Sequence, residues 1–375
     1  MRIIGQIMKK LPDQYSNHKI CKSKSISSMI CCNIPHIYNM FDVQDSHTAQ
    51  LISLTNMSDE TYRYSLLQEP ELHIHTSHHT CIKFRYDDIP DFNHENDNIL
   101  RPVFNLIQNV KMHAGVLQGV CIDLDYDFLN TDIRGNQAVL ALLLKIYIEH
   151  NNLQSHTILS TGISFGDIET ILNARPHTLL YQKEYEVPQH IPFNSSPYQL
   201  IIIDTQISNT YSTQIHKKSK AQSDEALNLL KKQFEYESLS MVPLNTLQYI
   251  NDYMLIKKAR HIITEQMRIN TAVELLKNGQ LVPIGELMFH SHASLRNDWD
   301  FIIPEADYIV NFTRNHEAGL GARFLYNNHP VSILALVHEA GLDKYTEELQ
   351  RFYHNQTGTA CIVRTIESAN GLLYS

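Results

Sequence analysis

Residues 291–300 have the sequence SHASLRNDWD, which is the most distinctive stretch of the chain. RHIITEQMR at 260–268 and GELM at 285–288 precede it, and PEAD at 304–307 and GAR at 321–323 follow it. Each of these short motifs carries charged, hydroxyl or glycine residues, and all of them fall within one continuous segment. Their order and spacing decide which fold the sequence predicts.

The chemistry of this stretch by itself predicts a structural polar cluster. Ser291 is expected to cap a helix, because a serine oxygen can accept a hydrogen bond from a backbone N–H of the first turn. His292, Arg296 and Asp298 are then expected to form a polar network near the start of that helix. No reaction follows from these residue types alone.

Composition predicts a globular chain of one large domain or two. Of 375 residues, 43% are hydrophobic and 19% are charged, and the net charge is -9. Proteins that wrap nucleic acid usually carry a basic balance or stripe, and the densest basic stretch here is HKKSK at 216–220, which we expect to be a solvated loop. We therefore expect no nucleic-acid partner.

The sequence also predicts a cytoplasmic protein with no membrane partner. There is no apolar run of about 18 residues, as a membrane-spanning helix needs. In Met1–Leu11 the basic residues follow the apolar ones, whereas a secretory signal has the opposite order. The six cysteines form no CxxC pair and no zinc-type spacing, so we expect buried, reduced thiols.

Strands and helices alternate in both halves, which predicts an α/β (α+β) architecture with two layers in each half. Apolar patterns predict strands within 51–84, 115–124, 199–204, 331–337 and 360–364. Helical patterns predict helices at 137–148, 223–234, 244–276 (with a possible break) and 342–353. Residues 1–39 are expected to be an irregular lead-in, followed by domains at 40–210 and 211–375 with a boundary in the polar loop near 205–220.

The motif series around 291–300 resembles the galactokinases, a branch of the GHMP sugar-kinase superfamily. Galactokinases carry an RHV helix with a following Glu and Arg, a block of the form LM..SH.SLRDDYEVS.PELD, and a GARMTGGGFGG turn. The resemblance covers roughly residues 240–365 and extends more weakly back to about residue 40, and Asp204-Thr205 is similar to the NT.V stretch of the family.

This resemblance implies both a fold and a reaction. The fold is a GHMP-kinase fold, with a ribosomal-S5-like N-terminal α/β domain at 40–210 and a ferredoxin-like C-terminal domain at 211–375. The reaction transfers the γ-phosphoryl group of ATP to the anomeric hydroxyl of galactose with Mg²⁺.

The phosphate loop that the family implies is altered. It has the form GLSSSA and precedes the helix predicted at 137–148, where this chain has DIRGNQA at 132–138. Only Gly135 survives, and no serine remains for Mg²⁺. Asp132 would repel a triphosphate and is expected to be a helix N-cap instead. Arg134, Gly135 and Asn136 are the remaining candidates for cofactor binding, suited to a smaller anion.

The sugar-binding signature of the family, GRVNLIGEHTDYNGG, fits best at 40–49, MFDVQDSHTA. On this alignment His47 remains as a substrate-binding candidate next to Thr48. The catalytic Arg of the family becomes Met40, its Glu becomes Ser46 and its Asp becomes Ala49. Residues 25–60 contain no arginine, so no nearby shift of the alignment restores the set.

The catalytic Asp of the family follows a CGIMDQ segment, which corresponds to FGDIET at 165–170. Glu169 takes the place of that Asp with one more methylene, and Asp167 is a neighbouring substrate-binding candidate. A misplacement of about 1 Å can cost about a hundredfold in rate, so Glu169 is a weak substitute. The glycine-rich GGGFGG turn is YNNHPV at 326–331. A family Tyr corresponds to His216, which the resemblance makes a further substrate-binding candidate.

Three functional hypotheses follow from this pattern. The first is a galactokinase-like pseudokinase that binds a sugar, a nucleotide or a partner and acts as a regulatory scaffold. The second is a divergent active galactokinase that uses ATP and Mg²⁺ on galactose or a related sugar. The third is an interaction module without a small ligand, which functions as a homodimer or with a protein partner.

One histidine-rich segment lies outside the resemblance. Residues 71–81 have the sequence ELHIHTSHHTC, and a strand would place His73 and His75 on one face. With His78, His79 or Cys81 they could bind a divalent metal. Because the chain carries 21 histidines, clusters by chance are expected, and we predict a solvent-facing strand and turn with no metal site.

Overall fold

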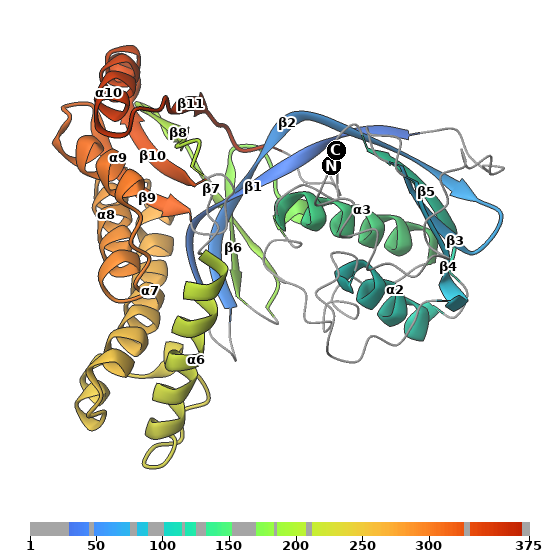
Figure 1. The fold of residues 1–375 in the computed structure, drawn as a ribbon, viewed down its shortest axis with the longest axis horizontal. Helices are drawn as coiled ribbons and strands as arrows, with labels where there is room; N and C mark the ends of the chain where they lie inside the picture. Colours follow the sequence, from blue (N-terminus) through green and yellow to red (C-terminus); the bar gives the residue numbers. More distant parts are fainter. Residues whose placement is uncertain are drawn as a thin grey trace. The chain divides into compact units, whose positions relative to one another are not determined.

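Figure 1 shows the fold in a computed structural model. The structure describes residues 30–44, 49–75, 81–88, 101–114, 117–124, 133–151, 170–183, 186–207, 212–325 and 331–369. The chain divides into two compact units, the first built mainly on Met57–Asn173 and the second on Ile37–Asn56 with Ala174–Ala369. The domain boundaries predicted from the sequence stay a prediction. No helix in the described part of the chain is long and apolar enough to span a membrane.

The first unit is a sheet with helices on one face. Its strands are β3 (Glu71–His75), β4 (Cys81–Arg85), β5 (Gly119–Leu124) and the end of β2 (Ala49–Leu67), in the order β4-β3-β5-β2. β3 and β5 are parallel, and the other pairs are antiparallel. Helices α2 (Arg101–Ala114) and α3 (Ile133–Asn151) cover the sheet (Figure 1), where Phe84 of β4 meets Phe104 of α2 edge to face at 4.8 Å.

The second unit is built on a four-stranded antiparallel sheet in the order β11-β8-β10-β9. These strands are β8 (Tyr198–Asp204), β9 (Gly319–Leu325), β10 (Ser332–His338) and β11 (Ile362–Thr365). β8 and β10 are central, and each contains a continuous buried apolar run, Leu200–Ile203 and Ile333–Val337, as strands with both faces covered do. The unit also contains β6 (Thr178–Lys183), β7 (Gln189–Pro192), the first part of β2 and the end of β1 (Ile30–Gln44).

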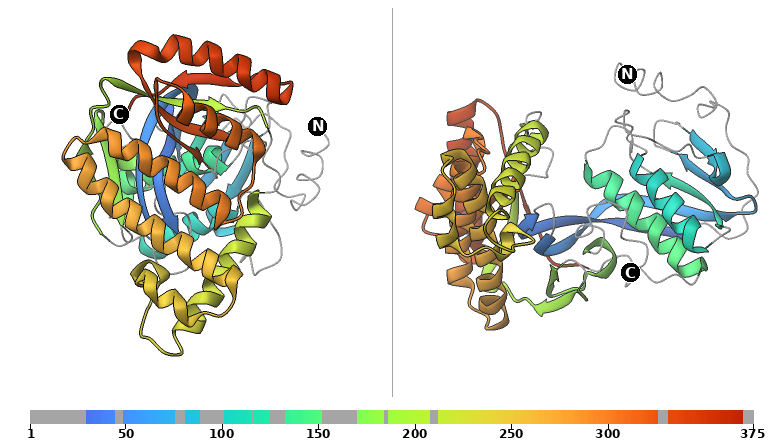
Figure 2. Two further views of the ribbon diagram at one scale, coloured as in Figure 1. Left: turned by 90° about the vertical axis from the view of Figure 1, so that its left-hand side faces the viewer. Right: turned by 90° about the horizontal axis from the view of Figure 1, so that it is seen from below.

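Five long helices complete the second unit (Figure 2): α6 (Ser212–Leu230), α7 (Tyr253–Lys277), α8 (Leu281–Asn297), α9 (Pro304–Asn315) and α10 (Leu342–Thr357). Local signals set their ends. The Asp252 carboxylate accepts hydrogen bonds from the backbone N–H groups of Met254 and Leu255 and caps α7. Gly358 ends α10 with φ of 72°, a left-handed conformation that glycine adopts without strain.

All the strands and helices that we expected have counterparts in the structure, and the α/β (α+β) class is confirmed. Three local predictions are wrong. β1 begins at Ile30, within the expected irregular lead-in. α6 begins at Ser212, so residues 216–220 are helical and not a loop. Ser291 lies inside α8 and caps no helix, because the apolar residues from Leu281 onward extend the helix toward its N-terminus.

Candidate functional site

For most of the predicted site residues, the structure describes no side-chain surroundings. His47, Asp167 and Glu169 lie outside the described residues, as do Asp132 and the 326–330 turn. Arg134, Gly135 and Asn136 form the first turn of α3, but their side chains are not among those described. His216 is the one predicted site residue whose side-chain surroundings are described, so the candidate site is built outward from it.

His216 lies on α6 and packs against Trp299, just beyond the end of α8, with ring centroids 6.0 Å apart. His261 of α7 contacts the same indole at 4.8 Å. The Ser219 hydroxyl, one helical turn after His216, donates to the Trp299 carbonyl at 2.8 Å. Trp299 therefore joins α6, α7 and the end of α8 around His216.

The charges around His216 hold it neutral. Burial lowers the pKa of His216, and the nearby Lys220 ammonium lowers it further, whereas the Asp42 carboxylate opposes both effects. A neutral imidazole can accept or donate one hydrogen bond but carries no charge toward an anion. This environment suits an internal packing role better than contact with a phosphate.

Asp42 of β1 forms a buried ion pair with Arg323 of β9. Arg323 Nη2 lies 3.1 Å from Asp42 Oδ1, and Arg323 Nη1 donates to the Met40 carbonyl at 2.8 Å. The two side chains are 1% and 3% exposed. Asp42 Oδ2 and Arg323 Nε have no hydrogen-bond partner among the described residues. This ion pair links β1 to β9 and is closed to solvent. Its role is therefore structural, although one oxygen of Asp42 and one nitrogen of Arg323 make no hydrogen bond to a described residue.

The distinctive motif residues form ion pairs between helices. Asp307 of α9 accepts from Arg296 Nε at 2.8 Å and lies 3.0 Å from His292 Nε2, both on α8. Asp298 accepts from Arg260 of α7 at 3.1 Å. The predicted network is therefore only partly confirmed: His292 and Arg296 share Asp307, Asp298 pairs separately with Arg260, and all three lie toward the C-terminal end of α8 and not at its start.

A second network ties α8 to α7 through Glu265, whose side chain is 1% exposed. Ser291 donates to its Oε2 at 2.9 Å, and Arg268 donates to its Oε1 at 2.8 Å. A buried carboxylate needs such partners, since leaving it unpaired costs several kcal/mol, on the order of 3–5. The hydroxyl that the sequence suggested as a helix cap therefore satisfies a buried acid.

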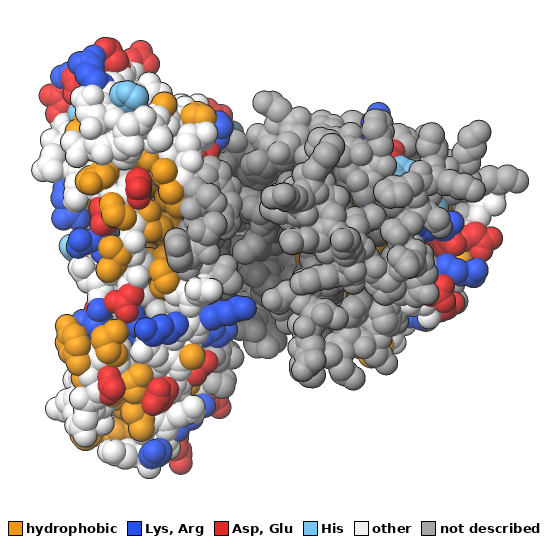
Figure 3. Space-filling model, in the orientation of Figure 1, with side chains coloured by type: hydrophobic (Ala, Val, Ile, Leu, Met, Phe, Trp, Pro, Cys, Tyr) orange, Lys and Arg blue, Asp and Glu red, His pale blue; other side chains and the backbone are white. Residues whose placement is uncertain are grey.

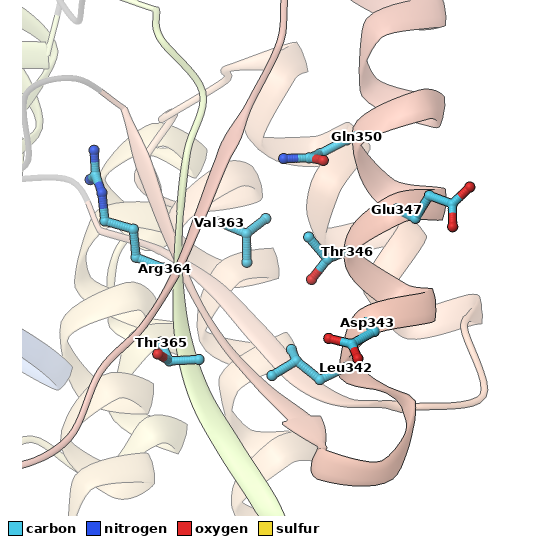
Figure 4. A pocket seen from close by; sticks show the side chains of 8 residues that line it. All are labelled: Leu342, Asp343, Thr346, Glu347, Gln350, Val363, Arg364 and Thr365. Carbon is cyan, nitrogen blue, oxygen red and sulfur yellow. The ribbon is translucent and has the colours of Figure 1, made fainter.

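Two surface grooves lie elsewhere on the second unit. One, of about 540 Å³, lies between α10 and β11, where Thr346, Gln350 and Val363 face one another (Figure 4). The other, of about 340 Å³, lies between α9 and α10. Neither groove contains a predicted site residue. On the face of this unit drawn in Figure 3, acidic, basic and hydrophobic side chains are interspersed.

The histidine-rich segment is placed differently from our expectation. His73 is completely buried, so the prediction of a solvent-facing strand is wrong there. β3 lies between β4 and β5, and the parallel register sets His73 beside Cys121 and His75 beside Asp123. The sequence carried no signal for this pairing, because the partner strand lies far along the chain. His78 and His79 are outside the described residues.

The chain is similar in sequence to galactokinases over about half of its length. The galactokinase of Thermotoga neapolitana is 29% identical over 189 residues, which are 50% of this chain and 52% of that protein. The galactokinase of Thermosipho africanus is 24% identical over 184 residues, 49% of this chain and 51% of that protein. The chain is therefore a relative of the galactokinases. The predicted family is thereby confirmed, although no protein-family model matches the chain.

Solved structures show the same fold for this galactokinase relative. Lactococcus lactis galactokinase, solved in complex with galactose, aligns with a TM-score of 0.79 and 16% identity over 98% of this chain and 99% of that one. Methanococcus jannaschii mevalonate kinase aligns with a TM-score of 0.53 and 14% identity over 92% of this chain and 100% of that one. The sequence match, in contrast, spans about half the length of the curated relatives.

Proposed function

We propose that this galactokinase relative has kept the scaffold of the family and lost phosphoryl transfer, and that it acts as a pseudokinase that binds a sugar, a nucleotide or a partner protein. The observation that carries the proposal is the start of α3. The helix begins at Ile133, so the residues that correspond to the phosphate loop form its first turn. Within 133–137, IRGNQ, there is one glycine and no hydroxyl or carboxylate side chain.

Phosphoryl transfer depends on positioning and on charge stabilisation. Backbone N–H groups must approach the triphosphate closely, which favours several glycines, and Mg²⁺ requires hard oxygen ligands. The first turn of α3 has no acidic residue and no serine or threonine. These residues do not fit a magnesium ion held at this loop.

The packing contacts support retention of the scaffold. Glu265, Asp298 and Asp307 each keep a described partner from a neighbouring helix or turn. Arg323 remains paired with Asp42 in the interior. Glu265 and Asp42 are the buried carboxylates among these, and removing the partner of a buried charge costs several kcal/mol, on the order of 3–5, so these two contacts support a maintained scaffold.

The second candidate is a divergent active galactokinase. The galactokinases that match in sequence, and the Lactococcus lactis galactokinase solved with galactose, favour it. In this case ATP and Mg²⁺ would be used, and Glu169 would take the role of the family's catalytic carboxylate. The two functions predict opposite results in one assay.

The test measures ADP release from the full chain with Mg-ATP and galactose, alongside a Glu169→Gln variant purified in the same way. The pseudokinase predicts equal background rates for both proteins. A galactose-dependent rate that the variant loses would contradict it and establish the kinase. A galactose-dependent rate that both proteins share in proportion to their concentration would also contradict the pseudokinase, and it would show in addition that Glu169 is not the catalytic carboxylate.

Thermal-shift titration then identifies the ligand class. A ligand that binds only the native state at 100 times its Kd adds about 2.7 kcal/mol of stability. We expect galactose or ADP to raise the melting temperature. If neither does, the ligand-binding part of the proposal fails and the chain is an interaction module.

A further inference from the structure

A second cluster of chemically active side chains lies in the first unit, on β3 and β5. One ring nitrogen each from His73 and His75 and the Cys121 Sγ all lie within 4.8 Å of one another. His73 and His75 are two residues apart on β3, so both point to the same face, and the register sets Cys121 directly beside His73. The sheet pairing therefore builds this cluster from two segments that the sequence keeps far apart.

Each imidazole contacts a carboxylate through one of its two ring nitrogens. His73 Nε2 lies 3.0 Å from Glu71 Oε2, and His75 Nδ1 lies 2.7 Å from Asp123 Oδ1. A carboxylate accepts the ring N–H, so these contacts fix both tautomers. Carboxylate-supported imidazoles are the usual arrangement for histidines that bind metal ions, because the contact orients the ring and raises its basicity.

The nitrogens opposite these contacts are left without partners. His73 Nδ1 and His75 Nε2 are buried atoms with no hydrogen-bond partner among the described residues. His73 is completely buried, so its unpaired lone pair cannot be satisfied by bulk water. Burying an unpaired polar atom costs about 1–3 kcal/mol, and a bound ligand would remove that cost.

We propose that His73 Nδ1, His75 Nε2 and the Cys121 thiolate bind a divalent cation of the zinc class. Two imidazoles and a thiolate are the donors that Zn²⁺ prefers, whereas Mg²⁺ and Ca²⁺ take oxygen ligands. This site is separate from the magnesium that the family uses with ATP, and it holds whether or not the chain transfers phosphate.

The surrounding charges suit such a cation. Lys83 lies 2.8 Å from Glu71 Oε2 and balances that carboxylate, so the thiolate supplies the charge nearest to the metal. The side chains of His75 and Asp123 are 30% and 23% exposed, which gives the ion a route from solvent.

The fourth coordination position is left for water. The side chain of His75 is 30% exposed, so water can reach the metal from that side. Zinc sites with three protein ligands and a bound water have this open arrangement. The metal would join β3 to β5 across their parallel pairing.

The test uses the full chain, stripped with a chelator and titrated with Zn²⁺ against a chromophoric competitor and with Co²⁺ in the spectrophotometer. We expect one equivalent to bind, with a thiolate-to-cobalt charge-transfer band. Cys121→Ser should abolish the band and weaken Zn²⁺ binding by about 100-fold or more. Asp123→Asn should keep the band and weaken binding by about 10- to 100-fold, since it removes only the support of His75.

His354→Gln serves as the matched control, because His354 is an exposed histidine of the second unit. It should leave both affinity and spectrum unchanged. If Cys121→Ser does not fold by circular dichroism, His75→Gln decides the question, because His75 is partly exposed and its loss should also weaken binding by about 100-fold. Absence of stoichiometric binding, or binding unchanged in the folded variants, would overturn the proposal.

Discussion

Arg323 carries a guanidinium that is 1% exposed, and its partner Asp42 is 3% exposed. Arg323→Met should lower the free energy of unfolding by about 3–5 kcal/mol, because it leaves the Asp42 carboxylate buried without its partner. Urea denaturation of the full chain measures this change. Replacing the whole pair, with Asp42→Leu added to Arg323→Met, should recover a large part of the loss.

The control for Arg323 is Arg351→Met. Arg351 pairs with Glu347 on the surface of α10, where both side chains are more than half exposed. Exposed pairs contribute at most about 1 kcal/mol, so this variant should unfold almost as the parent does. Equal losses from the buried and the exposed arginine would show that the interior ion pair does not hold β1 to β9.

His261 predicts a pH dependence at the residue scale. Burial, together with the positive charges of Arg268, Arg323 and Lys258, holds its pKa well below the usual value. The unfolded chain takes up a proton near pH 6.5 and the native protein does not. The free energy of unfolding should therefore be steady above that pH and fall as the pH drops below it.

Urea titrations across this pH range, with the parent and His261→Gln, measure the effect. Gln can keep a hydrogen bond to Ser294, which His261 Nδ1 contacts at 2.9 Å, but it does not titrate. The variant should show a shallower loss of stability below about pH 6.5. The pKa values of His73 and His216 are lowered too, so these residues also contribute to the loss of stability at low pH. The contribution of His261 is the difference between the slopes of stability against pH of the parent and of His261→Gln. Identical slopes for the two proteins would contradict the prediction that the pKa of His261 is lowered in the native protein.

At the scale of elements, α8 and β9 approach so closely that no side chain fits between them. A Cβ added at Gly285 would lie 2.2 Å from the Leu320 carbonyl oxygen, and one at Gly321 would lie 2.4 Å from the Gly285 Cα. Gly285→Ala should destabilise the protein by about 1–3 kcal/mol through overpacking. In an ordinary helix interior, replacing glycine with alanine stabilises the protein by about 1 kcal/mol. The sign of the change in the free energy of unfolding therefore shows whether α8 and β9 are in close contact at Gly285.

Thermal and urea unfolding of Gly285→Ala, compared with Glu286→Ala, measures this contact. Glu286 is the next residue of α8 and is exposed, so its replacement should change stability little. A stabilised Gly285→Ala protein would mean that α8 can move away from β9 without loss.

At the scale of the whole molecule, the compact units predict which fragments fold. β8 lies between β10 and β11, and β11 has no other partner in this sheet. A fragment of residues 211–375, cut at the domain boundary predicted from the sequence, lacks β8 and should show no cooperative melting by circular dichroism. A fragment of residues 174–369 joined to 37–56 contains the whole second unit and should melt cooperatively. Cooperative melting of 211–375 would support the sequence boundary instead.

The sequence by itself determined the family, the α/β class and the elements with strong local patterns. β8 and β10 each contain a continuous buried apolar run, and α10 has the period of a helix with one buried face, so neighbouring residues are enough to predict them. The motif series from 260 to 323 identified the galactokinase relationship because its residues are set by contacts between α7, α8 and α9.

Only the tertiary structure decided the burial of polar residues. His73 is interior because β5, far along the chain, pairs beside it, and Arg323 is interior because Asp42 from β1 neutralises it. His216 lies in a helix because α6 extends through a basic stretch that looks like a loop in isolation. Local sequence encodes secondary-structure propensity and hydrophobic period. The environment of a polar or charged residue depends instead on segments that meet only in the fold, and this is why the proposed cation site was not predicted.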